Sequence, residues 1–107
     1  MRARRFVRLF IAFAVLAGCE STTHQPPPVT AQMAKTGPAK QVSLATLQKG
    51  RTLFVSRCIE CHILPAVSSH TAAQWPRVVD EMAERSSLKE PERNALLAYL
   101  LAARSQM

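Results

Sequence analysis

The chain has 107 residues, which is enough for one small domain and little else. Fourteen Lys and Arg residues outnumber seven Asp and Glu residues, so the formal net charge is +7 at pH 7. Aromatic residues make up only 6% of the chain and do not alternate with basic ones in a patch, which argues against a nucleic-acid-binding protein.

The N-terminal segment has the layout of a secretory signal peptide. Arginines at positions 2, 4, 5 and 8 precede an apolar run over residues 9–17, which is too short to span a membrane. The end of this run and the two residues after it, Leu16-Ala17-Gly18-Cys19, resemble the lipobox of bacterial lipoproteins. This resemblance implies cleavage before Cys19 and acylation of Cys19. An ordinary signal peptide with a chance cysteine is the alternative. We therefore expect residues 1–18 to be a lipoprotein signal peptide, and the mature chain to be anchored in a bacterial membrane and to face the periplasm.

Residues 19–42 are expected to form a lipidated cysteine followed by a disordered, proline-rich tether. This segment contains three consecutive prolines, the turn-prone Gly37-Pro38 and almost no large apolar residue. Such a composition cannot bury enough surface to fold alone. Without the signal peptide, the chain keeps ten Lys and Arg residues and seven Asp and Glu residues. Most of the positive net charge therefore belongs to the removed segment.

The sequence Cys58-Ile59-Glu60-Cys61-His62 is typical of covalent haem attachment. Two thiols at this spacing can form thioether bonds to both haem vinyl groups, and His62 can then ligate the iron. A zinc site, a redox dithiol and a structural disulfide remain alternatives. Zinc usually takes four ligands, and the spacing of the three histidines fits no common zinc module. A thioredoxin-like dithiol would require a βαβ pattern, for which we find no convincing strand.

Three helices are expected in a haem domain over residues 43–107. The first covers 44–57 with Ser43 as its N-cap, and Gly50 within it would allow close approach of another helix. The second covers about 74–85, with Pro76 in its first turn. The third begins at Ser87 as N-cap of a capping box with Glu90 at N3, and ends near residue 104.

Met82 is the preferred candidate for the sixth iron ligand. It lies at helical spacing from Trp75 and two valines, on one apolar face, and a thioether suits a dry site beside iron. A core methionine that fills a gap, ligation by His70, and an open or water-bound iron are the alternatives. Trp75 and Arg77 are candidates for hydrogen bonds to a haem propionate; otherwise Trp75 is a core residue and Arg77 a solvated charge.

Residues 44–103 resemble the small mono-haem cytochrome c domains of bacteria. The resemblance is carried by three stretches of sequence: Gly50-x-x-x-Phe54-x-x-x-Cys58-x-x-Cys61-His62, Trp75-x-x-Val78-Val79-x-x-Met82 and Ala98-Tyr99-Leu100. It implies an all-α fold of three main helices around one covalently attached haem. In this family an aromatic residue of the last helix commonly crosses near the glycine of the first helix. One departure is that Met82 follows His62 by only twenty residues, whereas the common pattern has forty or more.

The resemblance also implies a function. Such proteins carry single electrons between redox partners and are not themselves enzymes, so we expect a monomeric domain with an unidentified electron donor and acceptor. A haem-based sensor or gas-binding module with an open sixth position is a second hypothesis. A haem-free lipoprotein that uses Cys58 and Cys61 as a disulfide or metal site is a third.

Overall fold

The computed structural model describes residues 25–35, 42–58 and 63–107, which contain helices and no strand. In chain order the elements are α1 (Ala31–Lys35), α2 (Leu44–Arg57), the short 3₁₀ helix η3 (Val67–Ser69), α3 (Trp75–Arg85) and α4 (Glu90–Ser105). The predicted all-α fold is therefore confirmed. Within these three ranges, no helix has both the length and the apolar character that a bilayer crossing requires.

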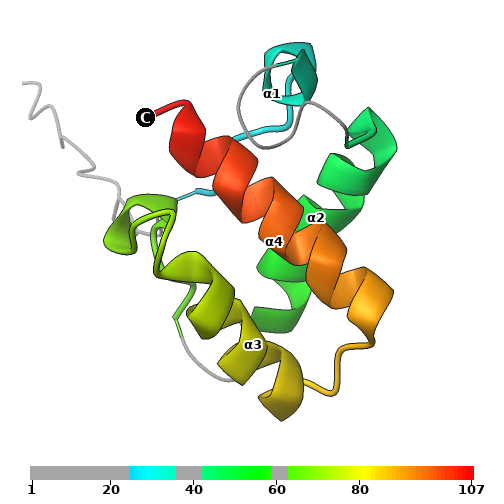
Figure 1. The fold of residues 1–107 in the computed structure, drawn as a ribbon, viewed down its shortest axis with the longest axis vertical. Helices are drawn as coiled ribbons and strands as arrows, with labels where there is room; N and C mark the ends of the chain where they lie inside the picture. The colour runs from blue at the N-terminus through cyan, green and yellow to red at the C-terminus, as the bar shows by residue number, and fades with distance from the viewer. Residues whose placement is uncertain (1–24, 36–41, 59–62) are drawn as a thin grey trace, which may run out of the picture.

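The crossing of α2 and α4 organises the fold, and Figure 1 shows α4 running across α2. The crossing point is at Gly50. A Cβ atom at that position would lie 2.7 Å from the Cβ atom of Tyr99, and closer still to the backbone oxygen of Ala95. The predicted close approach at Gly50, with the aromatic residue of the last helix beside it, is confirmed.

The start of α2 follows from a side-chain cap. Ser43 has an extended backbone, and its hydroxyl accepts a hydrogen bond from the backbone N–H of Thr46 at 3.1 Å. This bond satisfies one of the donors that a helix N-terminus leaves unpaired. The predicted bounds of α2 are confirmed. Helix α3 likewise has Pro76 in its first turn, as predicted, where the missing N–H of proline costs no helical bond.

The connection from α3 to α4 differs from the prediction. Ser87 does not cap α4; it has a φ of 54° and ends α3 instead. The N–H of Leu88 donates to Ala83 O at 2.9 Å, and the N–H of Ser87 donates to Glu84 O at 3.3 Å. These two bonds form a Schellman motif, which pairs the last carbonyls of α3.

Helix α4 begins two residues later than the predicted capping box would place it. Its N-cap is Lys89, and the N3 residue is Glu92 rather than Glu90. The Glu92 carboxylate accepts a hydrogen bond from the backbone N–H of Lys89 at 3.2 Å. Pro91 falls in the first turn of this helix, where its missing N–H leaves no acceptor unpaired.

An aromatic cluster forms the centre of the core. The Phe54 ring lies edge-on to Trp75, with ring centroids 6.3 Å apart, and at the same distance from Tyr99. All three residues have 0% exposure, as does Val79 of α3. Since Phe54 belongs to α2 and Tyr99 to α4, Trp75 joins α3 to the pair of crossing helices.

Several of residues 25–35 pack against the helices, which differs from the expectation of a disordered tether. The Tyr99 hydroxyl donates to Pro27 O at 2.6 Å. The guanidinium of Arg51 donates to Pro27 O and to Pro26 O, both at 3.1 Å. Met33 in α1 is only 2% exposed. Local composition did not indicate this packing, because the donors come from α2 and α4 and the acceptors are backbone carbonyls.

Tyr99 should lower the stability of the domain at high pH. Burial raises the pKa of Tyr99 from 10.0 to about 12, and the guanidinium of Arg51 partly offsets this increase. Above pH 10 the unfolded chain therefore releases the phenolic proton before the folded protein does. The free energy of unfolding should be insensitive to this group below pH 10, and should fall by roughly 2–3 kcal/mol as the pH approaches 12.

Urea unfolding at a series of pH values measures this effect, with Tyr99→Phe as the control. The variant loses one hydrogen bond, worth about 1 kcal/mol at neutral pH, although Pro27 O keeps its bond from Arg51. Its stability should no longer decrease between pH 10 and 12 by the amount seen in the parent. An equal alkaline decrease in both proteins would assign the effect to other groups.

Candidate functional site

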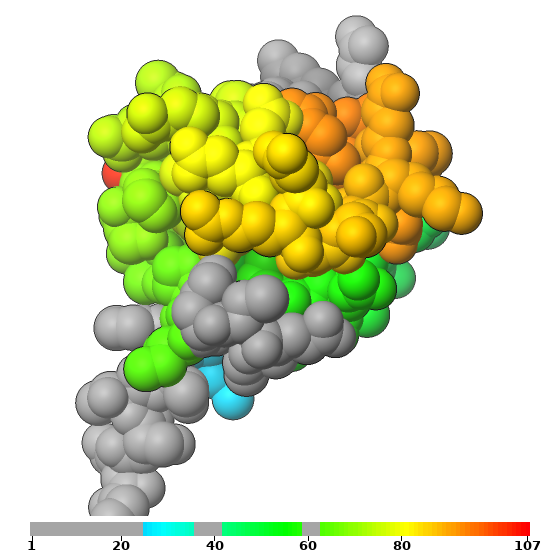
Figure 2. All heavy atoms as spheres, turned by 90° about the horizontal axis from the view of Figure 1, so that it is seen from below, coloured from blue at the N-terminus to red at the C-terminus, as the bar shows by residue number. Residues whose placement is uncertain are grey.

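A pocket of about 320 Å³ lies between α3, the end of α2 and the loop that precedes α3. This volume is at the lower end of the range of about 300–1,000 Å³ that is usual for small-molecule sites. Figure 2 shows the yellow atoms of α3 on the molecular surface, with the orange atoms at the start of α4 and the green atoms of α2 beside them. The residues that line the pocket are Cys58, His70, Arg77, Val78, Glu81, Met82, Arg85 and Ser86.

Cys58 follows the last residue of α2 and is only 4% exposed. The Arg57 guanidinium donates a hydrogen bond to Ser86 O at 2.6 Å. This bond holds the end of α2 against the end of α3, so the first cysteine of the haem-attachment motif lies at the pocket wall. The other residues of the motif, including Cys61 and His62, lie outside the described residues, as does the predicted lipidation site Cys19.

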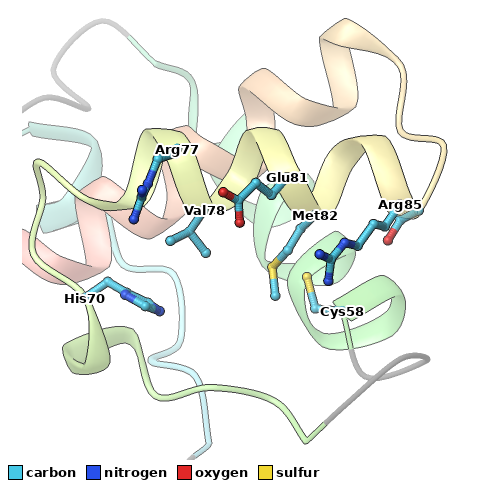
Figure 3. A pocket seen from close by; sticks show the side chains of 8 residues that line it. Cys58, His70, Arg77, Val78, Glu81, Met82 and Arg85 are labelled. Atoms are coloured by element: carbon cyan, nitrogen blue, oxygen red, sulfur yellow. The ribbon is translucent and has the colours of Figure 1, made fainter.

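Met82 is half-buried in α3 and lines the same pocket as Cys58. Figure 3 shows its side chain extending from the helix toward the sulfur of Cys58. The structure therefore brings the preferred sixth ligand together with the first cysteine of the motif. Ligation of iron by Met82 itself remains a prediction.

The predicted apolar face of α3 divides into two neighbouring faces. Trp75, Val79 and Ala83 are buried in the core. Val78 and Met82 are half-buried and line the pocket. The prediction from helical spacing treated these two sets as one face, because residues i and i+1 are only about 100° apart around a helix.

The two residues proposed for propionate contacts have different positions. Trp75 is fully buried, and its indole N–H donates to Val67 O at 3.0 Å. A propionate contact from Trp75 would require this bond to break. Arg77 is exposed and lines the pocket, so its side chain is available to a bound anion.

Sequence reasoning missed His70, Glu81 and Arg85 as pocket residues. The sequence analysis considered His70 only as an alternative iron ligand, and it assigned no role to Glu81 or Arg85. His70 lies with its ring 4.8 Å from that of Trp75, edge to face. A usable signal did exist: residues 77, 78, 81, 82 and 85 form one stripe at helical spacing around Met82.

The side chains of the pocket suit a haem. A haem bound here would find the buried sulfur of Cys58 for a thioether bond, the thioether of Met82 as an iron ligand and the apolar surface of Val78. Two arginines, one histidine and one carboxylate lie around them, so the charged groups match the two propionates of a haem better than they match a cation. Among the described residues, no three His, Cys, Asp or Glu side chains are grouped as they would be for a metal ion.

One curated protein is similar to part of this chain. A stretch of 58 residues is 41% identical to the cytochrome c-type protein TorY of Haemophilus influenzae. The match covers 53% of this chain but only 16% of the relative, so this chain spans a small part of that protein's length. No protein-family model and no solved structure matches the chain. The similarity supports a c-type cytochrome, in agreement with the attachment motif.

Proposed function

We propose that this protein is a mono-haem c-type cytochrome that transfers single electrons between redox partners and is not itself an enzyme. The observation that carries this proposal is the pocket in which Met82 faces Cys58, the first cysteine of the attachment motif. The partial similarity to a cytochrome c-type protein supports it independently.

The residues of the chain have separate tasks in this proposal. A bound haem would supply an iron that changes its charge by one electron. Cys58 and Cys61 would hold the ring by thioether bonds, and His62 would be the proximal ligand. Met82 would be the second axial ligand, and a methionine in this position raises the reduction potential. Two protein ligands leave no position for a substrate, which suits electron transfer rather than turnover.

The proposed location is the periplasmic side of a bacterial membrane, with the mature N-terminus anchored by lipid on Cys19. The arginine-rich start, the apolar run over residues 9–17 and the lipobox-like junction support this location. The electron donor and acceptor would be redox proteins that meet this domain in brief contacts of small area. Export before folding also suits covalent haem attachment, which takes place after the chain has crossed the membrane.

The haem content of the protein tests the proposal. The full chain, produced together with a haem-attachment system, should contain one covalent haem per polypeptide by the pyridine haemochrome assay. Cys58→Ala should lose most of the haem that survives denaturing electrophoresis, because one of its two thioether bonds cannot form. Ser56→Ala, which changes an exposed side chain one half-turn earlier in α2, should keep its haem. A colourless parent protein that is nevertheless folded would contradict the proposal.

A further inference from the structure

His70 and Cys58 lie at opposite ends of α3. The His70 ring contacts that of Trp75, which is the first residue of the helix. The chain next to Cys58 is bonded to Ser86, which follows the last residue of the helix, through Arg57. Figure 3 shows the same arrangement, with His70 and Arg77 toward one end of the pocket and Cys58 and Arg85 toward the other.

This arrangement gives the haem of the proposed function a direction in the pocket. The pocket residues of α3 extend from Arg77 to Arg85, about 12 Å along the helix at 1.5 Å per residue. The vinyl groups and the propionates of a haem are on opposite sides of the ring. Because a thioether to Cys58 would hold a vinyl group near the C-terminal end of α3, the propionates of a bound haem would lie toward its N-terminal end.

We infer that His70 binds the haem propionates together with Arg77, which the sequence already suggested for this role; the inference rests on the proposed function. Both side chains line the pocket at the end where the propionates would lie, and both can donate hydrogen bonds to a carboxylate. The N-terminal end of α3 adds a partial positive charge from the helix dipole. Glu81 is the acidic side chain among the residues that line the pocket. It lies four residues after Arg77, in the middle of the pocket residues of α3 rather than at their N-terminal end.

The backbone around His70 is held in place by hydrogen bonds from α3 and α4. The Arg104 guanidinium donates to His70 O at 3.1 Å. The Ser69 N–H donates to Ala66 O at 2.9 Å, and the Trp75 indole donates to Val67 O at 3.0 Å. These bonds tie the η3 turn to α3 and α4, so the imidazole is presented to the pocket without the cost of ordering a loop.

Resonance Raman spectroscopy of the haem-loaded protein tests this inference, because the propionate bending bands depend on hydrogen bonds to the propionates. His70→Ala and Arg77→Leu should each shift a propionate band to lower frequency and leave the amount of covalent haem unchanged. His70→Gln keeps an N–H donor, so its propionate bands should stay close to their frequencies in the parent protein. Arg85→Leu, which removes the same charge at the other end of α3, should leave the bands in place.

The outcomes separate the inference from the proposed function. A parent protein without covalent haem would overturn the proposed function itself. Unchanged propionate bands in His70→Ala and Arg77→Leu, or an equal shift in Arg85→Leu, would overturn the inference while the cytochrome proposal stands. If His70→Ala and His70→Gln both lose the low-spin haem spectrum, His70 is an axial ligand instead, and the inference is wrong. Band shifts confined to His70→Ala and Arg77→Leu would support it.

Discussion

Gly50→Ala should destabilise the domain by about 2–4 kcal/mol, a large part of the stability expected for a domain of this size. The new methyl group would lie 2.7 Å from the backbone carbon of Ala95 and 2.7 Å from the Cβ atom of Tyr99. Because these atoms belong to the backbone and the base of a side chain, no rotamer change can relieve the contact. Helices α2 and α4 would have to move apart, which would loosen the packing between Phe54 and Tyr99.

The sign of this prediction is informative, because alanine is otherwise the better helix former by nearly 1 kcal/mol. Urea unfolding followed by circular dichroism measures the change. Lys49→Ala is the matched control, since residue 49 is exposed in the same turn of α2. The free energy of unfolding of this variant should differ from that of the parent by less than about 0.5 kcal/mol. A Gly50→Ala protein as stable as the parent would show that the two helices do not cross at this distance.

Met82→Ala should keep the covalent haem but lower the reduction potential and open the sixth coordination position. Axial ligands set haem potentials over a range of about 0.8 V, so loss of the thioether should cost on the order of tenths of a volt. The weak long-wavelength charge-transfer band of methionine-ligated ferric haem should disappear. Carbon monoxide should bind rapidly to the reduced variant and not to the reduced parent.

Val78→Ala is the control for this prediction, because Val78 is also a half-buried pocket residue of α3, one turn before Met82. It should keep the charge-transfer band and remain inert to carbon monoxide. If Met82→Ala has the spectrum and potential of the parent, Met82 only fills space in the pocket. Rapid carbon monoxide binding by the parent itself would instead favour the haem-based sensor or gas-binding module.

The helices that carry their own end signals could be predicted from sequence. Ser43 defines the start of α2 because its side chain bonds to the nearby backbone, and this bond depends on no distant residue. Pro76 marks the first turn of α3 for a similarly local reason. Gly50 could be interpreted as a crossing point because a glycine in mid-helix lowers the stability of the helix. Its presence there is explained if a close contact with another helix leaves no room for a side chain.

The start of α4 could not be assigned correctly from a pattern match alone. Ser87 and Glu90 fit a capping box, but the same short segment also has to end α3, and the Schellman motif takes priority there. Pro91 held the information that decides between the two. With Ser87 as N-cap, Pro91 would be the fourth helical residue, and Ser87 O would lack its helical donor. With Lys89 as N-cap, the missing N–H of Pro91 costs nothing.

The candidate site was predicted in part for an equally physical reason. Helical spacing placed Met82 and Val78 on one apolar face of α3, and both line the pocket. The same spacing could not separate that face from the buried one that contains Trp75, because the division depends on where α2 and α4 lie. The contribution of His70 depends on the η3 turn, which the polar residues before Trp75 do not indicate.

If the protein is anchored in a membrane as proposed, the packing of Pro26 and Pro27 limits how far the domain could lie from the bilayer. With the lipid on Cys19, only residues 20–25 would separate it from Pro26 and Pro27, which are bonded to Arg51 and Tyr99. The seven peptide units from Cys19 to Pro26 extend at most about 25 Å, whereas a fully extended tether over residues 19–42 would span roughly 70 Å. A domain held so closely would work by short-range contact with neighbours in the same membrane, and partners would have to come to it.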